Sequence, residues 1–182
     1  MNNKCALLLC LLMLSVITGY AQSKRHNADY YFHSAAKYLV SPGDAVTDSI
    51  IKSNIALYTK AIQLDHKFYQ AYRNRSREYY QLKLYDKAIA DLISAIRYAK
   101  PKEKWYLYEM RADIYYEINN FKAAVYDLGF VISVDGNVAR AYLKRAKAYW
   151  QLNLKDKACN DYSKAFKMDP SVADNKEFLI CY

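Results

Sequence analysis

Three arginines and three aspartates recur along the chain at a constant separation. Each arginine precedes its aspartate by the same interval, in the pairs Arg75–Asp91, Arg111–Asp127 and Arg145–Asp161. A guanidinium and a carboxylate can form two parallel, charge-assisted hydrogen bonds that fix the geometry of both side chains. An anion-binding site is the alternative use of such arginines, but the matched aspartates favour structural ion pairs that hold two helices in register. The corresponding positions further upstream are Ser34 and Leu57, so there both partners are absent together.

Residue types that catalyse reactions or bind metals are scarce. The three histidines, His26, His33 and His66, lie near the N-terminus or in an expected turn. Their spacing suits neither a metal pair nor the base of a catalytic nucleophile. The chain has no glycine-rich phosphate loop, and Cys159 has no histidine near it in sequence. We therefore expect no enzymatic activity, no metal site and no cofactor.

Residues 1–21 have the pattern of a secretory signal peptide. Lys4 supplies a positive charge, and an almost unbroken apolar run extends from Cys5 to Ile17. Gly19 and Ala21 are small residues at the two positions that a signal peptidase inspects. Such a run forms about 20 Å of helix, whereas a membrane core is about 30 Å thick. Cleavage after Ala21 is therefore favoured over a membrane span, and we expect a periplasmic or secreted protein. The pattern is similar to the signal peptides of Bacteroidetes-type bacteria.

Loss of the signal peptide changes the cysteine count and the charge. Two of the four cysteines remain, Cys159 and Cys181, and the formal net charge of +9 falls by one because Lys4 is removed. An oxidising compartment permits a disulfide between Cys159 and Cys181. Two unpaired thiols are the alternative, and the sequence leaves both open.

The basic composition does not indicate a nucleic-acid partner. Lysines and arginines alternate with acidic residues and form no run of the kind found in basic arms. A membrane surface is expected as a partner only indirectly, because no exposed helix is expected to be strongly apolar.

The elements that position these residues follow from an internal repeat. Ala88, Ala124 and Ala158 are equivalent positions at nearly equal intervals, and the small excess of the first interval falls near Pro101. Small residues and tyrosines repeat in step with them, at Ser76, Ala112 and Ala146 and at Tyr79, Tyr115 and Tyr149. Within each repeat, apolar residues recur every three or four positions in two stretches, which predicts two amphipathic helices joined by a turn.

This pattern, with its Met168-Asp169-Pro170 ending, resembles the tetratricopeptide-repeat (TPR) family. The intervals match the repeat of that family, which is about 34 residues long. The resemblance implies an all-α, right-handed superhelix in one domain, residues 22–182. About four helix-turn-helix repeats are expected, approximately at residues 28–66, 69–101, 105–136 and 139–170, with a capping helix in 171–182. The first repeat is degraded, with a first helix expected from about Ala28 to Leu39 and a long turn after it. One hairpin cannot bury its own apolar face, so the repeats must stack.

The resemblance also implies a binding surface, because the first helices of TPR repeats line a concave face that holds peptides. Its residues would be Arg73, Asn74, Arg77 and Tyr80 from the second repeat, Glu109, Met110, Asp113 and Tyr116 from the third, and Arg140, Lys144, Lys147 and Trp150 from the fourth. Two basic groups would flank an acidic and apolar middle, which suits a peptide or protein with acidic groups. The face is distantly similar to a carboxylate clamp through Arg73, Arg140 and Lys144. It departs from that clamp at Arg77 and Met110, where asparagines are usual.

Together these features predict a non-enzymatic protein–protein interaction module of the periplasm or cell envelope. A structural subunit that assembles through its convex face or its incomplete first repeat is the alternative. A third alternative, an enzyme, has no candidate catalytic residue. The sequence names neither the partner nor the oligomeric state.

Overall fold

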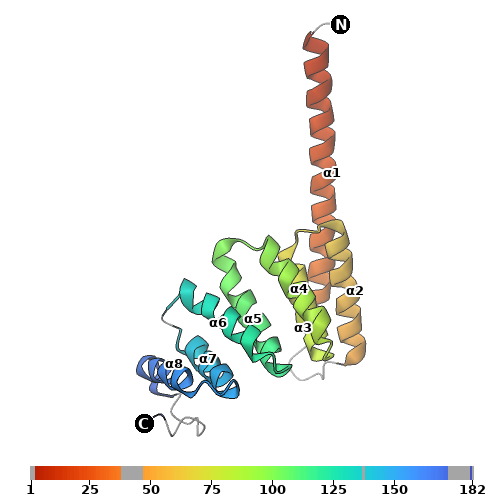
Figure 1. Ribbon diagram of the computed structural model, residues 1–182. Helices are drawn as coiled ribbons and strands as arrows, with labels where there is room; N and C mark the ends of the chain where they lie inside the picture. Colours follow the sequence, from red (N-terminus) through yellow and green to blue (C-terminus); the bar gives the residue numbers. More distant parts are fainter. Residues whose placement is uncertain (1–2, 38–46, 137, 172–180, 182) are drawn as a thin grey trace.

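The computed structural model describes residues 3–37, 47–136, 138–171 and 181, and the elements in these ranges are helices (Figure 1). In chain order they are α1 (Asn3–Lys37), α2 (Asp48–Leu64), α3 (Tyr69–Gln81), α4 (Tyr85–Tyr98), the short 3-10 helix η1 (Pro101–Glu103), α5 (Lys104–Glu117), α6 (Phe121–Val134), α7 (Ala139–Gln151) and α8 (Lys155–Met168). The interval from Ala88 to Ala124 is slightly longer than that from Ala124 to Ala158, and its additional residues lie next to η1, where the chain passes from α4 to α5.

The turns inside the last three hairpins are the same structure repeated. Lys83, Asn119 and Asn153 each adopt a left-handed backbone conformation, with φ between 57° and 59°. The amide of the following residue then donates to a carbonyl in the last turn of the helix, as from Leu84 to Tyr79 at 2.9 Å. This is the Schellman ending of a helix, and asparagine tolerates its left-handed position better than most residues. Local sequence therefore stops α3, α5 and α7 at equivalent places.

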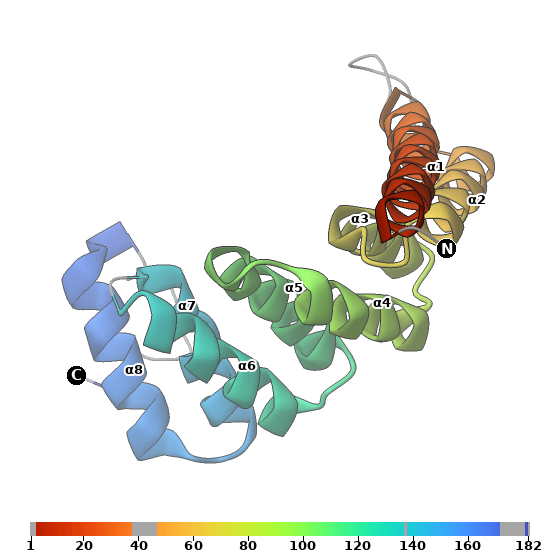
Figure 2. The same cartoon turned by 90° about the horizontal axis from the view of Figure 1, so that it is seen from above.

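The helices pair as α1–α2, α3–α4, α5–α6 and α7–α8, and consecutive hairpins stack through α2–α3, α4–α5 and α6–α7. Viewed from above, the four hairpins follow a curved path (Figure 2). Alanines without exposed surface, such as Ala88, Ala124 and Ala158, let neighbouring helices approach closely. Tyrosines and leucines fill the remaining space in each core cluster. The predicted all-α architecture of stacked hairpins is confirmed.

The N-terminal helix differs from the prediction. We expected it to begin near Ala28, but α1 begins at Asn3 and continues to Lys37, so it projects far beyond its partner α2 (Figure 1). No proline or glycine lies between Gln22 and Asn27 to end a helix there, and Gly19 alone does not interrupt it. Among the described residues, no helix combines the length and the apolar character needed to cross a membrane.

The C-terminal end lies partly outside the described residues. The predicted capping helix falls there, as do Leu39 and most of the predicted long turn. Cys181 is described, and it forms a disulfide with Cys159 of α8. Its side chain packs against the core of the last hairpin, together with Leu143 and Tyr149.

Candidate functional site

Three buried ion pairs connect the two helices of the last three hairpins. Each arginine holds its aspartate through two hydrogen bonds, as between Arg111 and Asp127, where Nε–Oδ2 and Nη2–Oδ1 are both 2.8 Å. The pairs Arg75–Asp91 and Arg145–Asp161 have the same arrangement, with bonds of 2.6 to 2.9 Å. The six charges hold the hairpins together and are thus not available to a ligand.

Sequence reasoning missed that each of these arginines also lies against two tyrosine rings. The Arg111 guanidinium is 5.1 Å from the ring centre of Tyr108 and 5.7 Å from that of Tyr115. The other two arginines contact the tyrosines at the same offsets, three positions before and four after. A guanidinium over an aromatic face is stabilised by the ring's quadrupole. The constant spacing between each arginine and its two tyrosines indicated this contact in the sequence. The contact involves six of the tyrosines.

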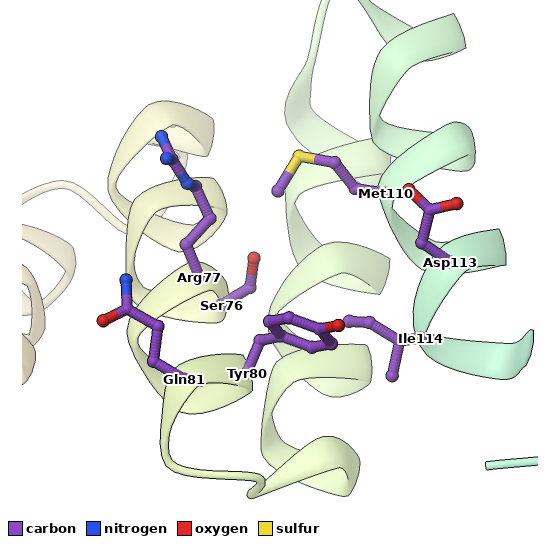
Figure 3. A pocket seen from close by; sticks show the side chains of 7 residues that line it. All are labelled: Ser76, Arg77, Tyr80, Gln81, Met110, Asp113 and Ile114. Carbon is purple, nitrogen blue, oxygen red and sulfur yellow. The ribbon is translucent and has the colours of Figure 1, made fainter. Parts of the chain in front are cut away.

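The predicted groove residues lie on the first helices of the hairpins, α3, α5 and α7. A hollow of about 370 Å³ lies between α3 and α5, lined by Ser76, Arg77, Tyr80, Gln81, Met110, Asp113 and Ile114 (Figure 3). A second, of about 280 Å³, shares Tyr80 and Asp113 with the first and extends to Lys144 and Lys147 of α7. A third, of about 300 Å³, shares Met110 and Asp113 and reaches Trp105 and Arg140. Because they share residues, the three hollows form one groove across α3, α5 and α7.

The charges in the middle of this groove neutralise one another. Arg140 donates to both carboxylate oxygens of Glu109 at 2.8 Å. Lys144 Nζ donates to Glu109 at 3.1 Å and lies 2.7 Å from an oxygen of Asp113. Arg140 and Lys144, which we expected to face an acidic ligand, are therefore already paired. The sequence did contain an indication of this pairing. Glu109 and Arg140 are separated by the same number of residues as Asp113 and Lys144.

This cluster holds Glu109 in its ionised form. Burial alone would raise the pKa of Glu109, but the hydrogen bonds from Arg140 and Lys144 and the charges of both cations outweigh it, so the pKa lies below its ordinary value. Four side chains from α5 and α7 thus form a neutral bridge between consecutive repeats.

The open part of the groove is smaller than predicted. Among the described residues, Arg77 and Lys147 have no ion-pair partner, and the Tyr80 side chain remains 39% exposed. Met110 and Ile114 line the first hollow together with Arg77 and Tyr80 (Figure 3).

Three other predicted groove residues, Arg73, Asn74 and Trp150, are engaged elsewhere. Arg73 donates to Asn74 at 2.9 Å and lies over the Tyr106 ring, while Asn74 donates to the Tyr58 hydroxyl. Trp150 packs against the core of the last hairpin. Tyr116, in contrast, lines the second hollow, and its ring packs against Phe121. In the part of the chain that the structure describes, no three histidine, cysteine, aspartate or glutamate residues are grouped to hold a metal ion.

Comparison with known proteins agrees with this architecture. The sequence model named tetratricopeptide repeat matches residues 139–172, the last hairpin and its ending. A DnaJ homolog subfamily C member 7 homolog from Dictyostelium discoideum is 28% identical over 100 residues, which is 54% of this chain and 19% of that protein. The chain therefore spans about a fifth of the curated relative that it matches.

Solved structures have the same fold. The crystal structure of MamA superposes with a TM-score of 0.69 at 20% identity, covering 81% of each chain. YrrB, described as a TPR protein with an unusual peptide-binding site, has a TM-score of 0.67 at 17% identity and covers 90% of this chain and 87% of its own. The first TPR domain of Spaghetti, solved with a bound HSP90 peptide, has a TM-score of 0.52 at 23% identity over 60% of this chain and 82% of its own. The fold is that of a TPR superhelix.

Proposed function

We propose that this protein is an exported, non-enzymatic binding module that holds an extended peptide or a peptide-like segment of a partner protein. The observation that carries the proposal is the continuous groove over α3, α5 and α7, which combines exposed aromatic and apolar surface with two unpaired cations. Rigid aromatic side chains give large contact areas at a low cost in conformational entropy. YrrB and Spaghetti bind peptides on the same fold.

The binding energy should concentrate between α3 and α5. Tyr80, Met110 and Ile114 form an apolar recess there that suits one side chain of the ligand, and Arg77 lies beside it (Figure 3). Arg77 can donate to a carbonyl or carboxylate of the ligand without breaking an existing ion pair. The bridge of Glu109, Asp113, Arg140 and Lys144 would instead hold the groove at a constant width.

A displayed library of random peptides, selected on the purified full chain, tests this function. Replacement of Tyr80 and Met110 by alanine should weaken the selected peptides roughly tenfold or more, the effect of losing about 1.4 kcal/mol of contact. The Tyr126→Ala variant is the matched control, because Tyr126 is an exposed tyrosine on α6, outside the groove lining. Affinity is measured by fluorescence anisotropy of labelled peptides. If the selected peptides bind the wild type, the Tyr80 and Met110 variant and the Tyr126→Ala variant equally, recognition lies on another surface. That result would favour the alternative function, a structural subunit that assembles through its convex face or first repeat.

Export through residues 1–21 is part of the proposal. The apolar side chains from Met13 to Tyr20 are 57–68% exposed on the projecting part of α1. Ala28 and Ala35 of α1 are buried, and both follow Ala21. Cleavage after Ala21 would thus keep the contacts between α1 and α2.

Intact-mass measurement of the protein recovered from the periplasm of a bacterial host checks this step. The mature chain should begin at Gln22. An Ala21→Asp variant should remain unprocessed, because the peptidase requires a small residue there. Recovery of the uncut chain in the cytoplasm would contradict export.

A further inference from the structure

The junction between α2 and α3 differs from the two later junctions at one pair of positions. Glu78 follows Arg75 by the same offset at which Ile114 follows Arg111 and Ala148 follows Arg145. On the preceding helix, Asn54 lies one repeat before Ala88, which is in turn equivalent to Ala124. The later junctions therefore have the apolar pairs Ala88–Ile114 and Ala124–Ala148, each within one core cluster. The first junction has the polar pair Asn54–Glu78, and these residues are only 1% and 4% exposed.

The contact between Asn54 and Glu78 is one hydrogen bond short. Asn54 Nδ2 donates to Glu78 Oε1 at 3.1 Å. Asn54 Oδ1 and Glu78 Oε2 are both buried and have no hydrogen-bond partner. An ionised carboxylate has no proton to donate, so both oxygens stay unsatisfied as long as Glu78 is charged. A proton on Oε2 can complete a reciprocal acid–amide pair, in which each side chain donates once and accepts once.

The surroundings of Glu78 favour the protonated form. Burial raises the pKa of Glu78 above its ordinary value, and the hydrogen bond from Asn54 and the charge of Arg77 offset this only in part. Tyr58 of α2 is a second titratable group near Glu78. On α4, Asp91 is held by Arg75 and Lys87 lies over the Tyr79 ring. The pKa of Glu109 is shifted in the opposite direction: two cations bind its carboxylate directly, and its pKa is lowered.

We propose that Glu78 is a neutral carboxylic acid in the folded protein and that its ionisation loosens the first hairpin, α1–α2, from α3. Loosening would uncover the cluster in which Tyr58 and Ala61 of α2 pack on Ala71 and Phe68. The acid is protonated more readily in the folded chain than in the open one. The stabilisation is thus complete below the ordinary pKa of glutamate and is lost as the pH rises through the higher folded value. Over that interval the opening equilibrium increases up to tenfold per pH unit.

Hydrogen exchange of the full chain, followed by mass spectrometry and corrected for intrinsic exchange, tests the proposal. Amides of α2 should lose protection relative to those of α7 as the pH increases from about 5 to about 8, a range above the ordinary pKa of glutamate near 4.3. Glu78→Gln should remove this dependence, because its amide donates to Asn54 at every pH. The double variant Asn54→Ala with Glu78→Ile installs the pair of the next junction and should be equally insensitive.

If the contact between Asn54 and Glu78 only packs the two helices and does not titrate, the exchange experiment gives a different result. Loss of α2 protection that is unchanged in Glu78→Gln, or no loss in the wild type, would overturn the proposal. An independent readout on the wild type does not depend on the variants folding. The infrared carbonyl band of a protonated carboxyl group should persist at about pH 6, and its absence would equally contradict a neutral Glu78.

Discussion

Replacement of Asp127 by alanine is expected to lower the free energy of unfolding by about 3–5 kcal/mol, the usual cost of leaving a buried charge without its partner. The Asp127 side chain is 1% exposed and accepts two hydrogen bonds of 2.8 Å from Arg111. Without it, the Arg111 guanidinium stays between two tyrosine rings with no counter-charge. Each kcal/mol corresponds to roughly 2–4 °C in Tm for a domain of this size.

Thermal unfolding followed by circular dichroism measures this effect. Asp113→Ala is the matched control, because the Asp113 side chain is 49% exposed and its ion pair with Lys144 lies at the surface. Its loss should cost no more than about 1 kcal/mol. The double variant Arg111→Met with Asp127→Leu should recover much of the stability, since it removes both charges together. A single variant that melts like the wild type would mean that the pair has no structural role.

Loss of the Cys159–Cys181 disulfide is expected to lower the free energy of unfolding by about 3 kcal/mol, through the entropy that the open loop regains in the unfolded chain. The two cysteines are 22 residues apart, and the bond attaches residue 181 to α8, a helix of the last hairpin. Cys181 also packs on the last hairpin, whose core includes Ala146 and Tyr162. The effect should therefore centre on α7 and α8.

Urea unfolding with and without reductant tests the role of the disulfide. The variant with both cysteines replaced by alanine should match the reduced wild type and should itself be insensitive to reductant. Hydrogen exchange should show loss of protection in α7 and α8 but not in α3. Equal midpoints for the reduced and oxidised wild type would contradict a stabilising role.

Local periodicity determined most of the architecture. Small residues, tyrosines and the left-handed turn positions recur with each repeat, so the hairpins of α3 to α8 could be predicted from the sequence. The three Arg–Asp pairs could be predicted for the same reason. Both partners belong to one hairpin with a turn of constant length, and the same sequence separation brings them together each time. The start of α1 was not predictable from the repeat pattern, because the projecting part of the helix lies outside the repeat.

The groove required the tertiary structure. Contacts between consecutive repeats depend on how one hairpin rotates and shifts on the next, and this superhelical geometry is not encoded in the period alone. Arg140 and Lys144 are residue types that can bind an anion. However, because α7 stacks beside α5, they form ion pairs with Glu109 and Asp113. The same stacking brings Asn54 against Glu78. The sequence by itself thus determined the hairpins and the ion pairs within them. Only the packing between hairpins decided which charges remain open to a ligand, because those contacts form across repeats.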